Sequence, residues 1–139
     1  MTVIGIGLPI LALSVLAGCV SGPEQPDSEE MYAKASVLTK LSAAVESTVR
    51  YKNPPPDLTD RQLLELATRH DPILLGNFEG YKVRVRREGR HAVVLVCDAS
   101  GNRALLEDAG CSGRMDQAHW MGNPGPCEFS IDLRQQCGD

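Results

Sequence analysis

The sequence predicts an α+β domain in which two N-terminal helices precede a small antiparallel sheet of about three strands. Two patterns in the spacing of apolar residues support this prediction. Apolar residues recur at three- and four-residue steps before a proline run, and they alternate with charged residues after residue 80. A third observation is that four cysteines lie in the last third of the chain, which indicates a cross-linked C-terminal part.

The first predicted helix covers about 28–50. Asp27 and Glu30 have the spacing of a capping box, with Asp27 as the N-cap. Between polar residues that we expect to be solvated, a single apolar stripe is expected to face the core. The residues of this stripe are Met31, Ala35, Leu38, Leu41, Val45 and Val49. The residues of the solvated face are Lys34, Lys40, Glu46 and Arg50.

A proline run, 54–56, ends this helix because proline has no amide donor. Thr59 and Gln62 form a second capping-box pattern, which predicts a helix over about 60–70 that ends before Pro72. His70 is then expected near the C-terminus of this helix, where a positive charge interacts favourably with the helix dipole.

Strands follow in the second half of the chain. Tyr81, Val83 and Val85 alternate with basic residues, and 91–97 is nearly continuously apolar, so the two segments predict a β-hairpin with its turn at 88–90. We expect a short helix over 103–109 with Gly110 after its end. Alternation over 127–133 predicts the third strand, and 112–126 is expected to be a loop.

Residues 2–18 are uncharged and mostly apolar, and they end in Leu16-Ala17-Gly18-Cys19. This ending resembles the lipobox of bacterial lipoproteins. The resemblance covers only the export segment, and it implies cleavage before Cys19 and lipid attachment to that residue. Residues 1–18 are therefore interpreted as a signal peptide, 19–27 as a lipidated tether and 28–139 as a single periplasmic domain. An uncleaved membrane anchor is the alternative, but the run is short for a membrane span and contains Gly5, Gly7 and Pro9.

In Gram-negative lipoproteins, an Asp directly after the lipidated cysteine tends to retain the protein at the inner membrane. Val20 stands there in this chain. For a Gram-negative cell, the resemblance therefore implies the outer membrane, with the domain facing the periplasm.

Four cysteines remain after lipidation of Cys19, an even number for an oxidising compartment, and two disulfides are expected. They are Cys97, Cys111, Cys127 and Cys137. If 127–133 is a strand, it spans about 20 Å, which leaves too few residues to bring Cys137 back to Cys127. Pairings of the first two cysteines with the last two are preferred, and both such pairings stay open. The alternative of a zinc site lacks the CxxC spacing typical of one.

The candidate binding residues are Lys82, Arg84 and Arg86, which share one face of a strand, and Trp120 in the predicted loop. The stripe could bind an acidic protein, lipopolysaccharide phosphate or an anionic wall polymer, or it could simply be a solvated face that protects a sheet edge. Trp120 could equally pack on the core. Glu107 and Asp108, beside Cys111, lack the spaced oxygen ligands of a calcium loop.

We find no motif for a nucleophile or a cofactor, and we expect no catalytic residue, bound metal or cofactor. The net charge of −4 argues against nucleic acid as the main partner. The sequence favours a non-enzymatic lipoprotein that binds another envelope protein or a wall polymer as an assembly or accessory factor. The alternative is an inhibitor or immunity lipoprotein directed against a lytic enzyme or toxin, with the loop 112–126 inserted into its target.

Overall fold

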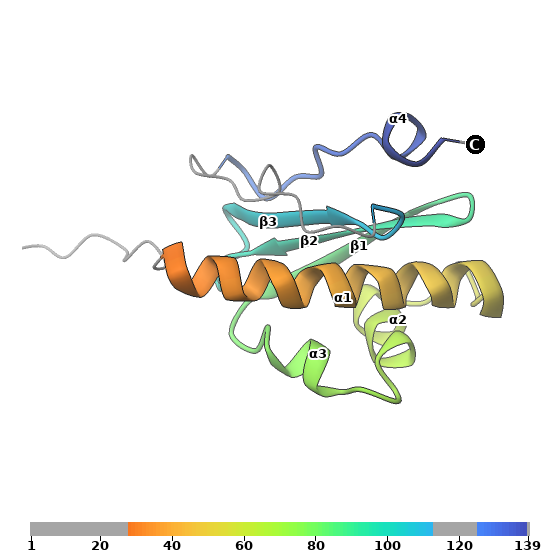
Figure 1. The fold of residues 1–139 in the computed structure, drawn as a ribbon, viewed down its shortest axis with the longest axis horizontal. Helices are drawn as coiled ribbons and strands as arrows, with labels where there is room; N and C mark the ends of the chain where they lie inside the picture. Colours follow the sequence, from red (N-terminus) through yellow and green to blue (C-terminus); the bar gives the residue numbers. More distant parts are fainter. Residues whose placement is uncertain (1–27, 113–124, 139) are drawn as a thin grey trace, which may run out of the picture.

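The computed structural model describes residues 28–112 and 125–138, which form three layers (Figure 1). Three helices cover one face of a three-stranded antiparallel sheet, and the C-terminal segment covers the other face. The main core lies between the helices and the sheet, and two smaller apolar clusters lie between the sheet and the C-terminal segment. Within the described ranges, none of the helices combines the length and apolar character needed to cross a bilayer.

Helix α1, Ser28–Lys52, is the long helix predicted by the spacing of apolar residues. All six residues of its predicted apolar stripe are buried. The prediction of a solvated face is wrong at Glu46, which is 6% exposed because His91 and Gly110 pack against it. The predicted N-cap, Asp27, lies outside the described residues.

Helix α2, Asp60–Ala67, begins with the predicted capping box: the Gln62 amide donates to Thr59 Oγ1, and the Thr59 amide donates to Gln62 Oε1. It ends at Ala67, earlier than predicted, because Thr68 is its C-cap. A further helical turn, α3, covers Ile73–Gly76. The predicted count of two helices before the sheet is therefore not confirmed.

The sheet has the order β1-β2-β3. Strands β1, Lys82–Glu88, and β2, His91–Cys97, form the predicted hairpin, in which Glu88 pairs with His91. The connecting turn needs glycine at its first position because Gly89 has φ +60°.

Strand β3, Ala104–Ala109, contradicts the short helix predicted over 103–109. All six of its residues are buried, since α1 covers one of its faces and the C-terminal segment the other. A strand buried on both faces shows no alternation of apolar and polar residues, and its sequence therefore gives no strand signal.

A turn at 98–103 connects β2 to β3. Partial desolvation tends to raise the pKa of Asp98, but hydrogen bonds from Asn102, Ser100 and Arg103 outweigh this effect and lower the pKa below its ordinary value. The ionised carboxylate therefore stabilises the turn.

The third strand predicted at 127–133 is also wrong. This segment forms no strand; just before it, an isolated bridge pairs Arg103 with Pro126, and the Cys127 amide donates to the Asn102 carbonyl. The segment crosses the outer face of the sheet and ends in a short helix, α4, Leu133–Cys137, which Asp132 caps by accepting from two backbone amides.

Candidate functional site

The predicted basic stripe lies on the outer face of β1, where the C-terminal segment also lies. One amino group of Arg84 donates to the Cys127 carbonyl at 2.7 Å, and Arg86 donates to the Ile131 carbonyl. The guanidinium carbons of both arginines lie 5.2 and 5.3 Å from the centre of the Phe129 ring. Two of the three cations thus hold the chain's own C-terminal segment, and binding of a partner by the stripe stays a prediction.

Two predicted site residues, Cys19 and Trp120, lie outside the described residues, as does most of the loop 112–126. His70 is exposed and lies beyond the end of α2, so the structure does not place it at a helix C-terminus.

The four remaining cysteines form two disulfides, Cys97–Cys127 and Cys111–Cys137. Each joins one of the first two cysteines to one of the last two, as predicted. The strand that excluded the other pairing is absent, and the extended segment with α4 separates Cys127 from Cys137 instead. Because the sulfurs are bonded in pairs, they are not thiolate ligands for zinc in this state.

Glu107 and Asp108 are structural. Each is 1% exposed. Glu107 accepts hydrogen bonds from the Ser130 and Ile131 amides, and Asp108 accepts from the hydroxyls of Ser42 and Ser112. They attach the C-terminal segment and α1, respectively, to β3.

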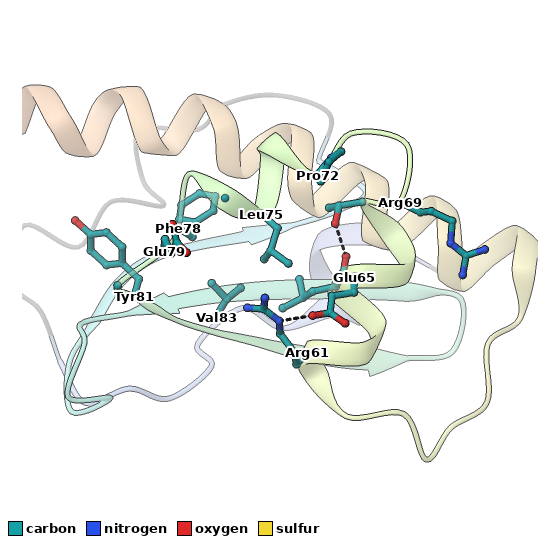
Figure 2. Close-up of a pocket in the computed structure, with 13 residues that line it drawn as sticks. Arg61, Glu65, Arg69, Pro72, Leu75, Phe78, Glu79, Tyr81 and Val83 are labelled. Atoms are coloured by element: carbon teal, nitrogen blue, oxygen red, sulfur yellow. Dashed lines mark hydrogen bonds and ion pairs between the residues drawn. The ribbon is translucent and has the colours of Figure 1, made fainter.

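A groove of about 380 Å³ lies between α2, α3 and the start of β1, and we call it the α2–α3 groove. Figure 2 shows Leu75 and Val83 pointing toward each other across its floor, with Arg61 and Glu65 at one side. Arg61 Nε donates to Glu65 Oε1 at 2.7 Å. The four charged residues that line it, Arg61, Arg69, Glu65 and Glu79, balance in charge, so the groove does not select for an ion of either sign.

Tyr81, at one end of this groove, links it to α1. Its hydroxyl donates to Glu30 Oε1 at 3.1 Å, and the Lys34 ammonium lies 5.0 Å from its ring centre. Burial is the main cause that raises the pKa of Tyr81, and the hydrogen bond and charge of Glu30 add to it. The phenol therefore remains a neutral donor at physiological pH.

A second groove lies between the C-terminal end of α1, the proline-containing connector, the start of α2 and the β1–β2 turn. Its volume is about 980 Å³. Four arginines line it, against a single acidic residue, Asp60. The arginines are Arg50, Arg86, Arg87 and Arg90, and we call this the arginine groove.

The arginines differ in how they are held. Arg87 donates to the carbonyl oxygens of Pro54 and Pro55, which fixes the connector against β1. The Nε atoms of Arg50 and Arg86 are buried and have no acceptor within the described ranges. Arg90 is exposed and makes no ion pair there. Arg50 also forms an ion pair with Glu46 at 3.8 Å, and the Arg86 guanidinium lies against Phe129 and the Ile131 carbonyl. Arg90 is thus the arginine of this groove that no ion pair or hydrogen bond holds among the described residues, and a guanidinium of this kind binds carboxylates or phosphates.

Sequence reasoning missed a third cluster, beside the β1–β2 turn at the start of β2. One ring nitrogen of His91 and the sulfurs of Cys111 and Cys137 all lie within 4.8 Å of one another. His91 Nδ1 is hydrogen-bonded to the buried carboxylate of Glu46. No signal in the sequence joins these residues, because they come from four separate segments.

No family model, curated protein or solved structure matches this chain. Its function must therefore be inferred from the residues themselves. The described geometry offers a cationic groove suited to anion binding and a histidine beside a disulfide.

Proposed function

We propose that this chain is a lipoprotein anchored to the outer membrane through Cys19, which faces the periplasm and binds an anionic envelope component without catalysing a reaction. The lipobox resemblance at Leu16 to Cys19 supports the anchor. The two disulfides suit an oxidising compartment. The observation that carries the binding role is the arginine groove, with four arginines against one acid.

The position of the groove fits a tethered protein. The tether would join the domain at Ser28, the first residue of α1, whereas Arg50 and Asn53 of the groove lie at the other end of this helix. Twenty-five residues at 1.5 Å each make α1 roughly 37 Å long. Anchoring at Ser28 therefore leaves the groove open to a partner.

The chemistry of the groove favours an acidic segment of another envelope protein. Guanidinium groups pair with carboxylates in fixed, two-pronged geometry. Arg50 and Arg90 come from separate elements that face the same groove; Arg90 has no ion pair within the described residues, and Arg50 is held by Glu46 at 3.8 Å through one of its amino groups. An extended acidic segment can reach both. Tethering raises the effective concentration of the domain near such a partner.

Cross-linking and pull-down from envelopes would test the groove with a matched pair of variants. Arg90→Gln should lower the yield of the bound partner, because it removes an arginine that has no ion pair within the described residues. Arg69→Gln removes the same charge from the α2–α3 groove and should leave the yield unchanged. Equal yields from both variants and the native protein would refute the groove as the binding site, and capture of a wall polymer or lipopolysaccharide would refute a protein partner.

The anchor has its own test. Cys19→Ser should move the protein from the membrane fraction to the soluble periplasm, because the thioether lipid can no longer form. Continued fractionation with membranes would contradict lipidation as the anchor.

An inhibitor or immunity role stays the alternative prediction. Its supporting feature, the loop 112–126, lies mostly outside the described residues. Inhibition of a lytic enzyme by the purified protein would favour that role over the accessory role.

A further inference from the structure

The two disulfides differ in their surroundings. Among the described residues, a histidine lies beside only one of them: a ring nitrogen of His91 is within 4.8 Å of the sulfurs of Cys111 and Cys137. We propose that Cys111–Cys137 is a redox-active bond that exchanges with an anionic low-molecular-weight thiol, with His91 as the base. This inference does not depend on the proposed function, because none of its residues except Arg90 lines the arginine groove.

His91 is placed to accept a proton beside the sulfurs. Its Nδ1 is held by Glu46 Oε1, so Nε2 is the ring nitrogen left for a proton from a thiol. Glu46 is 6% exposed, and its Oε2 has no hydrogen-bond partner among the described residues. A buried carboxylate that orients an imidazole beside a sulfur is the arrangement that activates cysteine nucleophiles. Glu46 is thus a positioning residue for His91.

Access also distinguishes the two bonds. Both sulfurs of Cys111–Cys137 belong to partly exposed residues, whereas in Cys97–Cys127 only Cys127 is partly exposed and Cys97 is fully buried among Leu95 and Ala104. An incoming thiolate cannot reach Cys97, and attack at Cys127 would release a thiolate into an apolar environment that disfavours its charge. Cys97–Cys127 should therefore exchange slowly, and it provides an internal reference.

A cavity of about 350 Å³ opens beside His91, between the β1–β2 turn and α4. Its charged lining residues are Glu88, Arg90 and Arg134, and the Glu88 carboxylate already accepts from Arg134 Nε at 2.9 Å. One positive charge is left over in this cavity. A thiol that carries carboxylates, such as the tripeptide thiol glutathione, matches the charge of the cavity and a volume typical of small-molecule sites.

The cavity is lined by His91 and by Gly138, which directly follows Cys137 in the chain. We therefore take Cys137 as the sulfur that the thiol attacks. The thiol gives its proton to His91, its sulfur bonds to Cys137 Sγ, and the disulfide bond breaks with its electron pair on Cys111. The imidazolium stabilises this thiolate and then protonates it. A second thiol displaces Cys137, so two thiols are oxidised to their disulfide and the protein disulfide becomes two thiols.

The test uses the full chain carrying Cys19→Ser, so that no fifth thiol interferes. The protein is incubated with reduced glutathione, quenched with acid and alkylated, and each cysteine peptide is quantified by mass spectrometry. Cys111–Cys137 should open at least about tenfold faster than Cys97–Cys127, since a general base contributes on the order of 100-fold. The transient glutathione adduct should lie on Cys137. Equal rates for the two disulfides would overturn the proposal.

His91→Gln separates a base from a merely structural residue, because the two roles change the rate in opposite directions. Loss of a base should slow the opening of Cys111–Cys137 about tenfold or more and leave Cys97–Cys127 unchanged. Loss of packing would expose the sulfurs and speed the reaction. An unchanged or faster rate in this variant would refute the role of His91.

The preference for an anionic thiol is tested at the exposed rim of the cavity, where substitutions should not disturb folding. Arg134→Gln should slow exchange with glutathione, and Glu88→Gln should speed it, each by a few-fold at low ionic strength and less in high salt. With cysteamine, which is cationic, Arg134→Gln should speed exchange and Glu88→Gln should slow it. Each rate is first divided by the rate of the same thiol with a small reference disulfide. The same response to both thiols would rule out charge selection by this cavity.

Discussion

Glu107 is expected to be the main attachment of the C-terminal segment to the sheet, apart from the disulfides. Its carboxylate is buried and accepts from three donors: the Ser130 amide at 2.9 Å, the Ser130 hydroxyl at 2.6 Å and the Ile131 amide at 2.9 Å. Replacing Glu107 with Ala leaves these donors without their acceptor.

The cost follows from what each donor can do next. The Ser130 hydroxyl can rotate to another acceptor, whereas the two amides are fixed. A buried donor left without a partner costs about 1–3 kcal/mol. Because Ser130 is exposed and water can reach its amide, we expect the lower part of that range there, and about 3 kcal/mol in total for Glu107→Ala. Glu107→Gln keeps one oxygen acceptor and should cost about 1–2 kcal/mol.

Urea unfolding followed by circular dichroism, with both disulfides intact, measures these differences in the free energy of unfolding. Hydrogen exchange at the Ser130 and Ile131 amides should accelerate in Glu107→Ala. Glu128→Ala is the matched control, since this exposed glutamate of the same segment should change stability by less than about 0.5 kcal/mol. A loss below about 1 kcal/mol in Glu107→Ala, or a larger loss in Glu107→Gln, would refute this account.

Two further predictions concern packing and pH. Gly110→Ala should lower the free energy of unfolding, measured in urea, by about 3 kcal/mol, because the new Cβ would lie 2.5 Å from the Ser42 carbonyl oxygen. Gly76→Ala is the control: the space around its new Cβ is open, so this variant should be neutral or slightly stabilising. Equal effects of the two substitutions would contradict the close packing of α1 on Gly110. The lowered pKa of Asp98 means that its ionised form adds stability above the ordinary pKa of 3.8, and that this stability is lost as the pH falls through the lower folded-state pKa. The difference in urea midpoint between the native protein and Asp98→Asn should therefore be present at pH 7 and vanish near about pH 2, and a constant difference would count against it.

The sequence predicts α1 well, because the helical spacing of its six apolar residues identifies the buried face without any information about the sheet on which this face packs. Glu46 shows the limit of this reasoning. It adjoins the stripe, and its burial depends on His91 and Gly110, which lie far away in the sequence. Local spacing cannot indicate such contacts.

The segment 127–133 shows a different limit. Phe129 and Ile131 are partly buried and Leu133 is buried, while Ser130 and Asp132 are exposed, so the alternation correctly predicts which side chains face the sheet. It does not predict whether the backbone pairs with a strand. The alternation predicts the third strand at this segment, whereas the third strand of the sheet, β3, lies at 104–109, where burial on both faces removes the alternation.

The candidate sites also depend on contacts between distant segments, which local sequence patterns do not indicate. The four arginines of the arginine groove include only one member of the predicted stripe, Arg86, since the other three gather from α1, the end of β1 and the turn. The cluster of His91 with Cys111 and Cys137 depends on which cysteines pair, and the sequence leaves two pairings open. Tertiary contacts alone assemble both sites.

The order of the cysteines makes the two covalent loops overlap, because Cys97–Cys127 begins before Cys111 and Cys111–Cys137 ends after Cys127. A protease that cuts the chain once between Cys111 and Cys127 would leave two fragments joined by both bonds. A single cut between Cys97 and Cys111, or between Cys127 and Cys137, would leave them joined by one. The backbone of this region can thus be nicked anywhere from residue 97 to residue 137 without release of either fragment, as long as both bonds are oxidised.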